Sequence, residues 1–304
     1  MLQSFFKAST ILSFLAFTIS VPTFTAFAQD NDVISVDSSI VVVNAAVTDA
    51  SGKAVAGLTL KQFHVFEDGT EQAIQSFEAE ETPFAAVILI DTSGSMEERV
   101  SLARAAAIQF LGGLRINDVA SIYNFDRKVE LIQDFSNSHD MLDRIFDLKA
   151  NGTTVLNDAI YRAAEVLSKR PEKRRAIIVL SDGGDTSSGK SAEKALRAAL
   201  AVNAMIYCVD MSAPDLSPNE KASNRGALTN FADKTGGKYI ETPGGLAMRD
   251  AFHRIVEELG QQYTIAYQPS NIIKDGKWRS IKLVISRPNL TIRTRRGYNA
   301  PKSR

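Results

Sequence analysis

The chain has 304 residues, with 35 basic and 35 acidic side chains, 44% hydrophobic residues and one cysteine. This length allows about two domains of about 150 residues each, and the hydrophobic and charged fractions are those of a globular protein and exclude a disordered chain. A formal net charge of zero provides no basic stripe for nucleic acid, so we expect no nucleic-acid partner. The single cysteine excludes an internal disulfide and a paired-cysteine zinc or redox motif.

Residues 1–28 have the pattern of a signal peptide. Lys7 precedes a mainly apolar stretch over 11–21, and Ala26-Phe27-Ala28 forms an A-x-A cleavage site. An uncleaved membrane anchor is the alternative, which Pro22 and the scattered hydroxyl residues disfavour. No later stretch is long and apolar enough to cross a bilayer. We therefore predict an exported protein, periplasmic or secreted, without an integral membrane span after cleavage.

Two segments, 29–81 and 261–304, have the pattern of strands and turns. The first contains a β-branched run over 39–49 and a hairpin over 63–78 that turns at Asp68-Gly69. The second contains three strand-like stretches, at 261–269, 278–286 and 290–298. Because each segment is too short for a core of its own, we expect the two to pack together as one β-sandwich-like subdomain.

The segment 82–260 alternates between strands and helices. The predicted strands cover residues 84–91, 119–126, 175–182, 204–210 and 237–242. The predicted helices cover residues 99–114, 138–148, 156–170, 191–203, 226–235 and 246–260. Unbroken apolar strands between amphipathic helices indicate a mostly parallel sheet covered on both faces. We therefore predict a Rossmann-like, doubly wound α/β domain inserted between the two β segments.

Three polar clusters are expected at the carboxyl edge of this sheet, where open α/β sheets bind ligands. They lie at residues 91–95, 151–154 and 181–183, and they offer hydroxyl and carboxylate oxygens without nitrogen or sulfur. Such a set suits Mg²⁺, Mn²⁺ or Ca²⁺ rather than zinc. Two carboxylates brought together also favour a cation, because like charges otherwise raise one pKa.

These clusters resemble a known family. DTSGSM after an apolar strand, then GTTVLNDAI and VLSDG, are similar to the metal-ion-dependent adhesion site of von Willebrand factor type A domains, and the flanking segments resemble an exported subgroup often found in acidobacteria. The family threonine lies six residues before an apolar anchor, here Ile160, which selects Thr154 over Thr153. The resemblance implies that the metal residues are Asp91, Ser93, Ser95, Thr154 and Asp182. It also implies a non-enzymatic module that binds an Asp or Glu carboxylate of a partner through a divalent cation, with Mg²⁺ favoured.

Three alternatives are weighed against this hypothesis. In one, the protein has a structural role in the envelope and its metal only stabilises the fold. In another, Gly184–Ser191 matches the P-loop pattern of NTPases; exported proteins meet little ATP, however, and the acid-ending strand precedes this loop instead of following it. A serine hydrolase is disfavoured because none of the three histidines lies in a polar cluster and no G-x-S-x-G motif occurs.

Overall fold

The structure is a computed structural model that describes residues 40–79, 82–138, 145–213, 216–241 and 245–302. The predicted signal peptide and its cleavage site lie outside the described residues, as does most of the helix predicted over 138–148. Within the described residues, no helix has the length and apolar character needed to span a membrane.

In the described part of the chain, the central sheet has six strands in the order β10-β9-β8-β5-β6-β7. Their bounds are β5 (Phe84–Asp91), β6 (Val119–Phe125), β7 (Val129–Ser136), β8 (Arg174–Ser181), β9 (Ala204–Asp210) and β10 (Tyr239–Glu241). All neighbouring strands pair in parallel except β6 and β7. This confirms the predicted, mostly parallel sheet.

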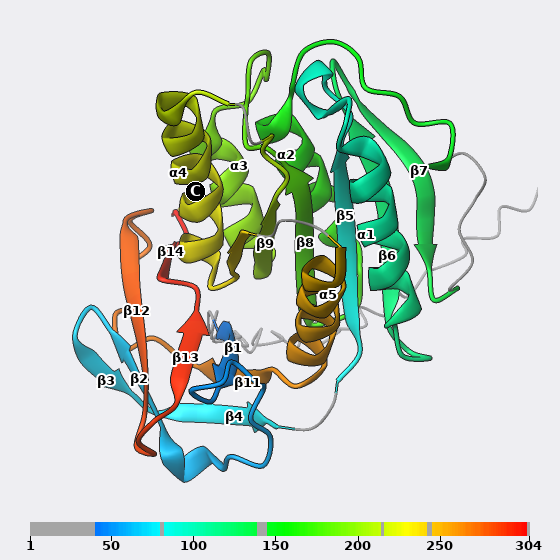
Figure 1. The fold of residues 1–304 in the computed structure, drawn as a ribbon. Helices are drawn as coiled ribbons and strands as arrows, with labels where there is room; N and C mark the ends of the chain where they lie inside the picture. The colour runs from blue at the N-terminus through cyan, green and yellow to red at the C-terminus, as the bar shows by residue number, and fades with distance from the viewer. Residues whose placement is uncertain (1–39, 80–81, 139–144, 214–215, 242–244, 303–304) are drawn as a thin grey trace, which may run out of the picture. The chain divides into compact units, whose positions relative to one another are not determined.

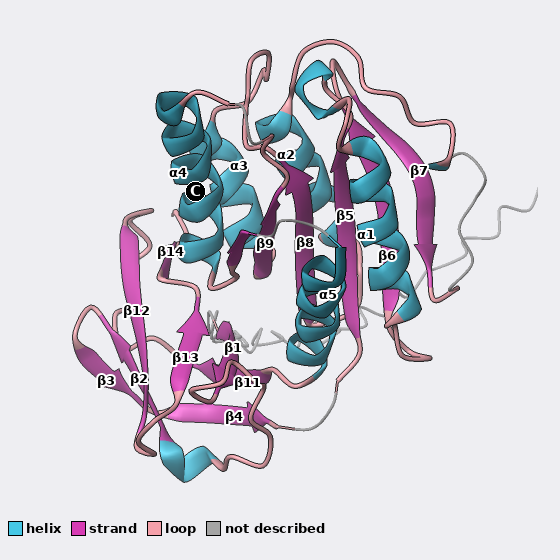
Figure 2. Ribbon diagram, viewed as in Figure 1, coloured by secondary structure: helices cyan, strands magenta, loops and turns pink. Residues whose placement is uncertain are grey.

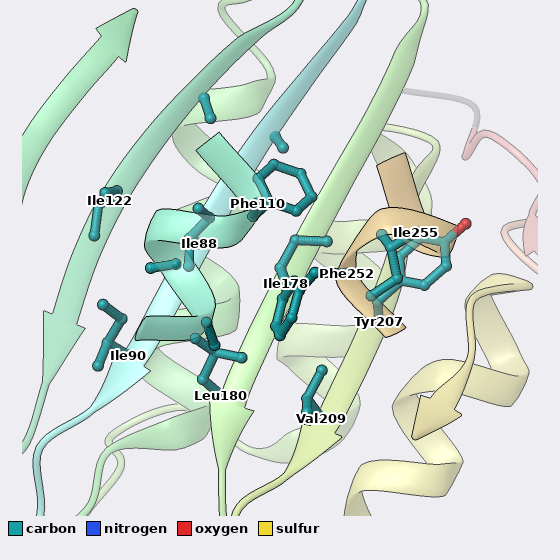
Figure 3. Packing of buried hydrophobic residues seen from close by; sticks show 14 of the residues in the cluster. Ile88, Ile90, Phe110, Ile122, Ile178, Leu180, Tyr207, Val209, Phe252 and Ile255 are labelled. Atoms are coloured by element: carbon teal, nitrogen blue, oxygen red, sulfur yellow. The ribbon is translucent and has the colours of Figure 1, made fainter. Parts of the chain in front are cut away.

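The α-helices of the described residues cover the two faces of this sheet (Figures 1 and 2). Their bounds are α1 (Val100–Gly112), α2 (Leu156–Leu167), α3 (Ala192–Ala201), α4 (Pro218–Thr235) and α5 (Gly245–Gly260). Side chains of α1 and α5 share one buried cluster with the sheet, and those of α2, α3 and α4 share another. Figure 3 shows Phe110 of α1 and Phe252 of α5 among the apolar side chains of the first cluster. The doubly wound α/β fold is therefore confirmed.

Two elements of this domain differ from the prediction. Strand β7 was not predicted, because two apolar residues, Leu131 and Ile132, follow each other in it and interrupt the alternation of polar and apolar residues. In the structure Leu131 is 41% exposed and Ile132 is 6% exposed. Helix α4 begins at Pro218 instead of residue 226, since Ser217 caps it by accepting the N–H of Glu220. The first two turns of α4 are polar, so no apolar periodicity marked them.

The two β segments form two four-stranded antiparallel sheets, in the orders β13-β1-β11-β4 and β14-β12-β2-β3. Their bounds are β1 (Val41–Thr48), β2 (Phe63–Glu67), β3 (Thr70–Gln72), β4 (Ile74–Glu78), β11 (Tyr263–Tyr267), β12 (Trp278–Ile285), β13 (Thr291–Thr294) and β14 (Gly297–Asn299). Strands from the two ends of the chain pair in both sheets, β1 with β11 and β2 with β12. Residues of both sheets share one buried cluster. The expected sandwich-like subdomain is present, while the boundaries at residues 81 and 260 stay predictions.

The predicted hairpin over 63–78 is confirmed for its first arm, its turn and the start of its second arm, β3. Asp68 and Gly69 have φ values of 47° and 83°, as a tight two-residue turn between β2 and β3 requires. The second arm divides, because β4 leaves this sheet and pairs with β11. Phe77 of β4 packs against Phe63 and Tyr263, with ring centroids 5.2 and 5.8 Å away. The contacts of this partly buried ring favour the position of β4 beside β11.

The last turn of α5 is bonded to strands of two different sheets. The Tyr207 hydroxyl of β9 donates to Glu258 at 2.5 Å, and Arg293 of β13 forms an ion pair with the same carboxylate. The side chains of Glu258 and Arg293 are only 9% and 22% exposed. This buried group therefore joins α5 to the central sheet and to an antiparallel sheet.

Candidate metal site

Asp91 is the last residue of β5, and its carboxylate is fully buried. One oxygen, Oδ1, accepts the backbone N–H of Ser93 at 2.9 Å. The other, Oδ2, accepts the hydroxyl of Ser181 at 2.6 Å, from the end of the neighbouring strand β8. The carboxylate is thus held at the carboxyl edge of the sheet, where the sequence predicted it. Ser181 itself was not predicted as a site residue, although it stands directly before Asp182 in one of the three polar clusters.

Ser93 and Ser95 lie on the turn that follows β5. A short helical turn over Gly94–Met96 brings their Oγ atoms to 3.2 Å from each other. Two neighbouring ligands of an octahedral ion with bonds of about 2.1 Å are about 3.0 Å apart, so the spacing fits two ligands of one small divalent ion. Ser93 is buried and Ser95 is exposed beside a groove of about 350 Å³.

The loop that carries Thr154 is bonded to this turn. Asn151 donates its N–H to the carbonyl of Thr92 at 2.8 Å, and Gly94 donates to the carbonyl of Gly152 at 3.2 Å. Gly152 has a φ of 79°, which a residue with a side chain adopts only with strain. Thr154 is buried, with its N–H donating to Thr186 Oγ1 at 2.9 Å. These bonds bring the second polar cluster to the edge that holds the first.

Asp182 directly follows β8 and is 4% exposed. Its Oδ1 accepts the N–H of Gly184 at 2.9 Å. Burial, together with the charge of Asp182, raises the pKa of Asp91 to about 6, against the lowering effect of its bonds from Ser181 and Ser93. Two ionised carboxylates at this edge are therefore unfavourable without a compensating cation.

The donor set fits a hard divalent cation that is held largely by hydroxyl groups. Hydrogen bonds link Asp91 with Ser93 and Ser93 with Ser95. The backbone bonds of Asn151 and Gly152 bring the loop of Thr154 to the same edge. The charge of Asp182 affects the pKa of Asp91. Among the described residues, no group of three or more His, Cys, Asp or Glu side chains is arranged to hold a metal. A site here therefore depends on the serine and threonine oxygens, which differ from the ligands of zinc sites.

Backbone N–H groups of the P-loop-like segment Gly184–Ser191 bind a carboxylate of the chain itself. The carboxylate of Asp158 accepts the N–H groups of Gly189 at 2.9 Å and Lys190 at 2.8 Å. Lys190 Nζ lies 5.5 Å from the centroid of the Tyr161 ring. Because a carboxylate already occupies the loop donors that a phosphate would need, the geometry does not favour nucleotide binding.

We expect Lys190→Ala to change neither nucleotide affinity nor fold. The ammonium group contributes only a partly exposed contact with the ring of Tyr161, so the free energy of unfolding should fall by no more than about 1 kcal/mol. Calorimetric titration with MgATP and thermal denaturation check both parts, with Lys194→Ala as the control because Lys194 Nζ lies 5.7 Å from the same ring. Binding of MgATP that Lys190→Ala abolishes would restore the NTPase hypothesis.

The histidines give no support to hydrolysis at the serine cluster. His64 Nδ1 lies 2.8 Å from Glu71 Oε1 within the antiparallel β2–β3 pair, and His253 is an exposed residue of α5. His139 lies outside the described residues. A base that would activate Ser93 or Ser95 is therefore not found among the described histidines.

Residues 86–184 match the family model of the von Willebrand factor type A domain. The match runs from β5 past Asp182 and includes all five candidate metal residues. Together with the doubly wound sheet, it supports a von Willebrand factor type A domain in the α/β part of the chain.

Solved structures with this fold include a von Willebrand factor type A protein from Catenulispora acidiphila, with a TM-score of 0.50, 15% identity, and coverage of 88% of this chain and 75% of that one. The PilB minor pilin from Streptococcus sanguinis has a TM-score of 0.46 and 16% identity, over 63% of this chain and 64% of the pilin. The von Willebrand factor domain of the type V pili tip protein Mfa5 from Porphyromonas gingivalis has a TM-score of 0.48 and 14% identity, over 59% of this chain and 95% of that one. This chain therefore spans less than two thirds of the pilin. At such identities the likeness concerns the fold alone, and a comparison with curated proteins finds no match.

Proposed function

We propose that this chain is an exported, non-catalytic protein-binding module that uses a divalent cation to bind an Asp or Glu carboxylate of a partner protein. The observation that carries the proposal is the pair of hydroxyls of Ser93 and Ser95, 3.2 Å apart, beside the buried carboxylate of Asp91. Mg²⁺ is the favoured ion, with Mn²⁺ and Ca²⁺ as alternatives, because all the donors are oxygens. The signal-peptide pattern of residues 1–28 supports export.

The residues at this edge would contribute to a cation site in two ways. Asp91, oriented by Ser93 N–H and Ser181, and Asp182 supply negative charge, whereas Ser93, Ser95 and Thr154 supply neutral oxygens. A bound cation would provide a positive charge with an open position for a carboxylate. Ser95 is exposed and borders the groove, so the partner is expected to approach from its side.

Ser95→Ala should weaken divalent-cation binding without changing the fold. Loss of one neutral ligand should lower the affinity for Mg²⁺ or Mn²⁺ at least about tenfold, or about 1.4 kcal/mol. Because Ser95 is exposed and its hydroxyl contacts only that of Ser93 among the described residues, the unfolding free energy without metal should change by less than about 0.5 kcal/mol. Calorimetric titration with MgCl₂ and MnCl₂ measures the affinity. Ser187→Ala, an exposed serine on the neighbouring loop, is the matched control, and an unchanged affinity in Ser95→Ala would contradict the ligand assignment.

A capture experiment separates partner binding from a purely stabilising metal. The immobilised full chain is incubated with envelope extract in Mg²⁺, in chelator, and in chelator followed by excess Mg²⁺. A specific partner should be released by chelator, return with Mg²⁺, and be lost in Ser95→Ala but retained in Ser187→Ala. Replacing the partner's contacting Asp or Glu by the amide should abolish capture. Partner binding that resists chelator would contradict the proposal, and metal binding that stabilises the fold without any chelator-sensitive partner would favour the structural alternative.

A further inference from the structure

A cavity of about 420 Å³ lies at the opposite end of β8 from the candidate metal site. Three basic residues, Lys173, Arg175 and Arg295, line it, and none of the described lining residues is acidic. The polar side chains of Asn203, Tyr298 and Asn299 also line it, and the rest of the wall is aliphatic: Ile40, Val41, Val42, Pro171, Ala201, Val202 and Pro301. The cavity thus combines positive charge with an apolar surface.

Arg295 is a buried cation at this cavity, and it is only 8% exposed. Its guanidinium donates to the carbonyls of Leu200 at 3.2 Å and Val42 at 2.7 Å, and lies 5.5 Å from the ring centroid of Tyr298. Its Nε has no hydrogen-bond partner among the described residues. Burial lowers the pKa of Arg295, and only tyrosines act in the opposite direction. No hydrogen bond or ion pair of the described residues joins it to a carboxylate, and a buried charge without such a partner is unfavourable.

Arg175 and Asn203 also line this cavity, and each has a buried donor atom without a partner in the described part of the chain. Arg175 donates to the carbonyls of Val202 at 3.1 Å and Arg170 at 2.6 Å. Its Nε and the Nδ2 of Asn203 have no partner among the described residues. Burial lowers the pKa of Arg175 as well.

Two described glutamates near the cavity already form ion pairs, one of them with the lining residue Lys173. Glu78 forms an ion pair with Lys173, and Glu172 pairs with Arg170 at 2.6 Å while its charge also acts on Arg175. Neither glutamate lines the cavity. The positive charge of Arg295 in particular is left without compensation by the lining residues.

Capping of α3 explains only part of this arrangement. The carbonyls of Leu200 and Val202 lie at the carboxyl end of α3, where a cation is favourable. A helix end is equivalent to roughly half an elementary charge, which two guanidinium groups exceed. The cap also leaves the three unpartnered donors and the cavity itself unexplained.

We propose that this cavity binds a small organic oxyanion, a carboxylate or a phosphate carried on a short aliphatic body. The anionic head compensates Arg295 and Arg175, since guanidinium groups form strong charge-assisted bonds to both kinds of oxyanion. The aliphatic body packs on the wall that contains Val42 and Val202. An apolar pocket with a few convergent polar groups is the usual form of a small-molecule site, and 420 Å³ is within the usual range of volume.

Calorimetric titration of the full chain with octanoate and with octyl phosphate tests the proposal. Chelator is present throughout, so the result does not depend on the candidate metal site. At least one of the two ligands should bind with 1:1 stoichiometry and at least about tenfold more tightly than 1-octanol or inorganic phosphate, which each carry half of the recognised chemistry. The tighter of the two identifies the head group. The proposal is overturned if neither anion binds, or if octanol binds as tightly as the tighter of the two anions.

Substitutions locate the binding. Arg295→Gln and Arg175→Gln should each weaken binding at least about tenfold through loss of a charge-assisted hydrogen bond. Arg295→Gln is checked for folding by circular dichroism, and Arg175→Gln decides the test if the first variant unfolds. Arg197→Gln is the matched control, because Arg197 is an exposed residue of α3 that pairs with Glu193 at 3.0 Å and does not line the cavity. Unchanged affinity in a folded Arg175→Gln overturns the assignment.

Discussion

Replacing Asp91 by asparagine is expected to abolish divalent-cation binding and, at the same time, to stabilise the metal-free chain at neutral pH. Burial, reinforced by the charge of Asp182, raises the pKa of Asp91 to about 6 from an ordinary value near 4. The ionised carboxylate therefore costs the folded state about 2 to 3 kcal/mol without metal. An amide avoids this cost, because its oxygen can accept from Ser93 N–H and its nitrogen can donate to the Ser181 hydroxyl.

The sign of the pH dependence follows from the raised pKa. The cost is fully present above the folded pKa of about 6, and it disappears as the pH falls below the unfolded value near 4. The advantage of Asp91→Asn over the wild-type chain should therefore be largest near pH 7.5 and shrink toward pH 4.5. Urea denaturation in chelator at the two pH values measures it.

The same denaturation experiment repeated with Mg²⁺ tests the metal site. The wild-type chain should be stabilised by Mg²⁺, and Asp91→Asn should not be, because ligand binding to the folded state alone raises its stability. Asp250→Asn removes an exposed carboxylate of α5 and serves as the control. An Asp91→Asn chain that is less stable than wild type in chelator at pH 7.5, or that Mg²⁺ stabilises equally, would contradict the prediction.

Glu258→Ala should be the most destabilising of the proposed substitutions, by about 3 to 5 kcal/mol. It leaves the guanidinium of Arg293 and the hydroxyl of Tyr207 without their shared carboxylate in the interior. Desolvation of an uncompensated charge accounts for most of the loss. Urea denaturation followed by circular dichroism measures it, and Glu257→Ala, at the exposed neighbouring position, is expected to change stability by less than about 0.5 kcal/mol.

A double-mutant cycle separates the ion pair from the packing of α5. In Glu258→Ala combined with Arg293→Met, the loss should be smaller than the sum of the single losses by about 1 to 3 kcal/mol, because no buried charge is left unpaired. Arg293 also donates to the carbonyl of Gly237 at 2.7 Å, so recovery should be incomplete. Strictly additive losses would indicate that the contact does not couple α5 to β13.

Elements that are buried along their whole length were the easiest to predict. Strands β5 and β9 begin and end as the apolar runs predict, since each is covered on both faces and leaves an unbroken apolar pattern. Strand β7 and the first turns of α4 were missed because they are partly exposed, so their polar and apolar residues do not follow one period. The change of sheet between β3 and β4 was also missed, because β4 pairs with β11, which lies far along the chain.

The sequence by itself determined the alternation of strands and helices, and with it the meeting of Asp91 and Asp182 at one edge. Parallel strands present their carboxyl ends on the same side, so residues far apart in the chain become neighbours by topology alone. Only the tertiary structure decided the 3.2 Å spacing of Ser93 and Ser95, the bond from Ser181 to Asp91, and the cavity around Arg295. The pattern of polar and apolar residues indicates which face of an element is buried, whereas these contacts depend on how separate elements pack against one another.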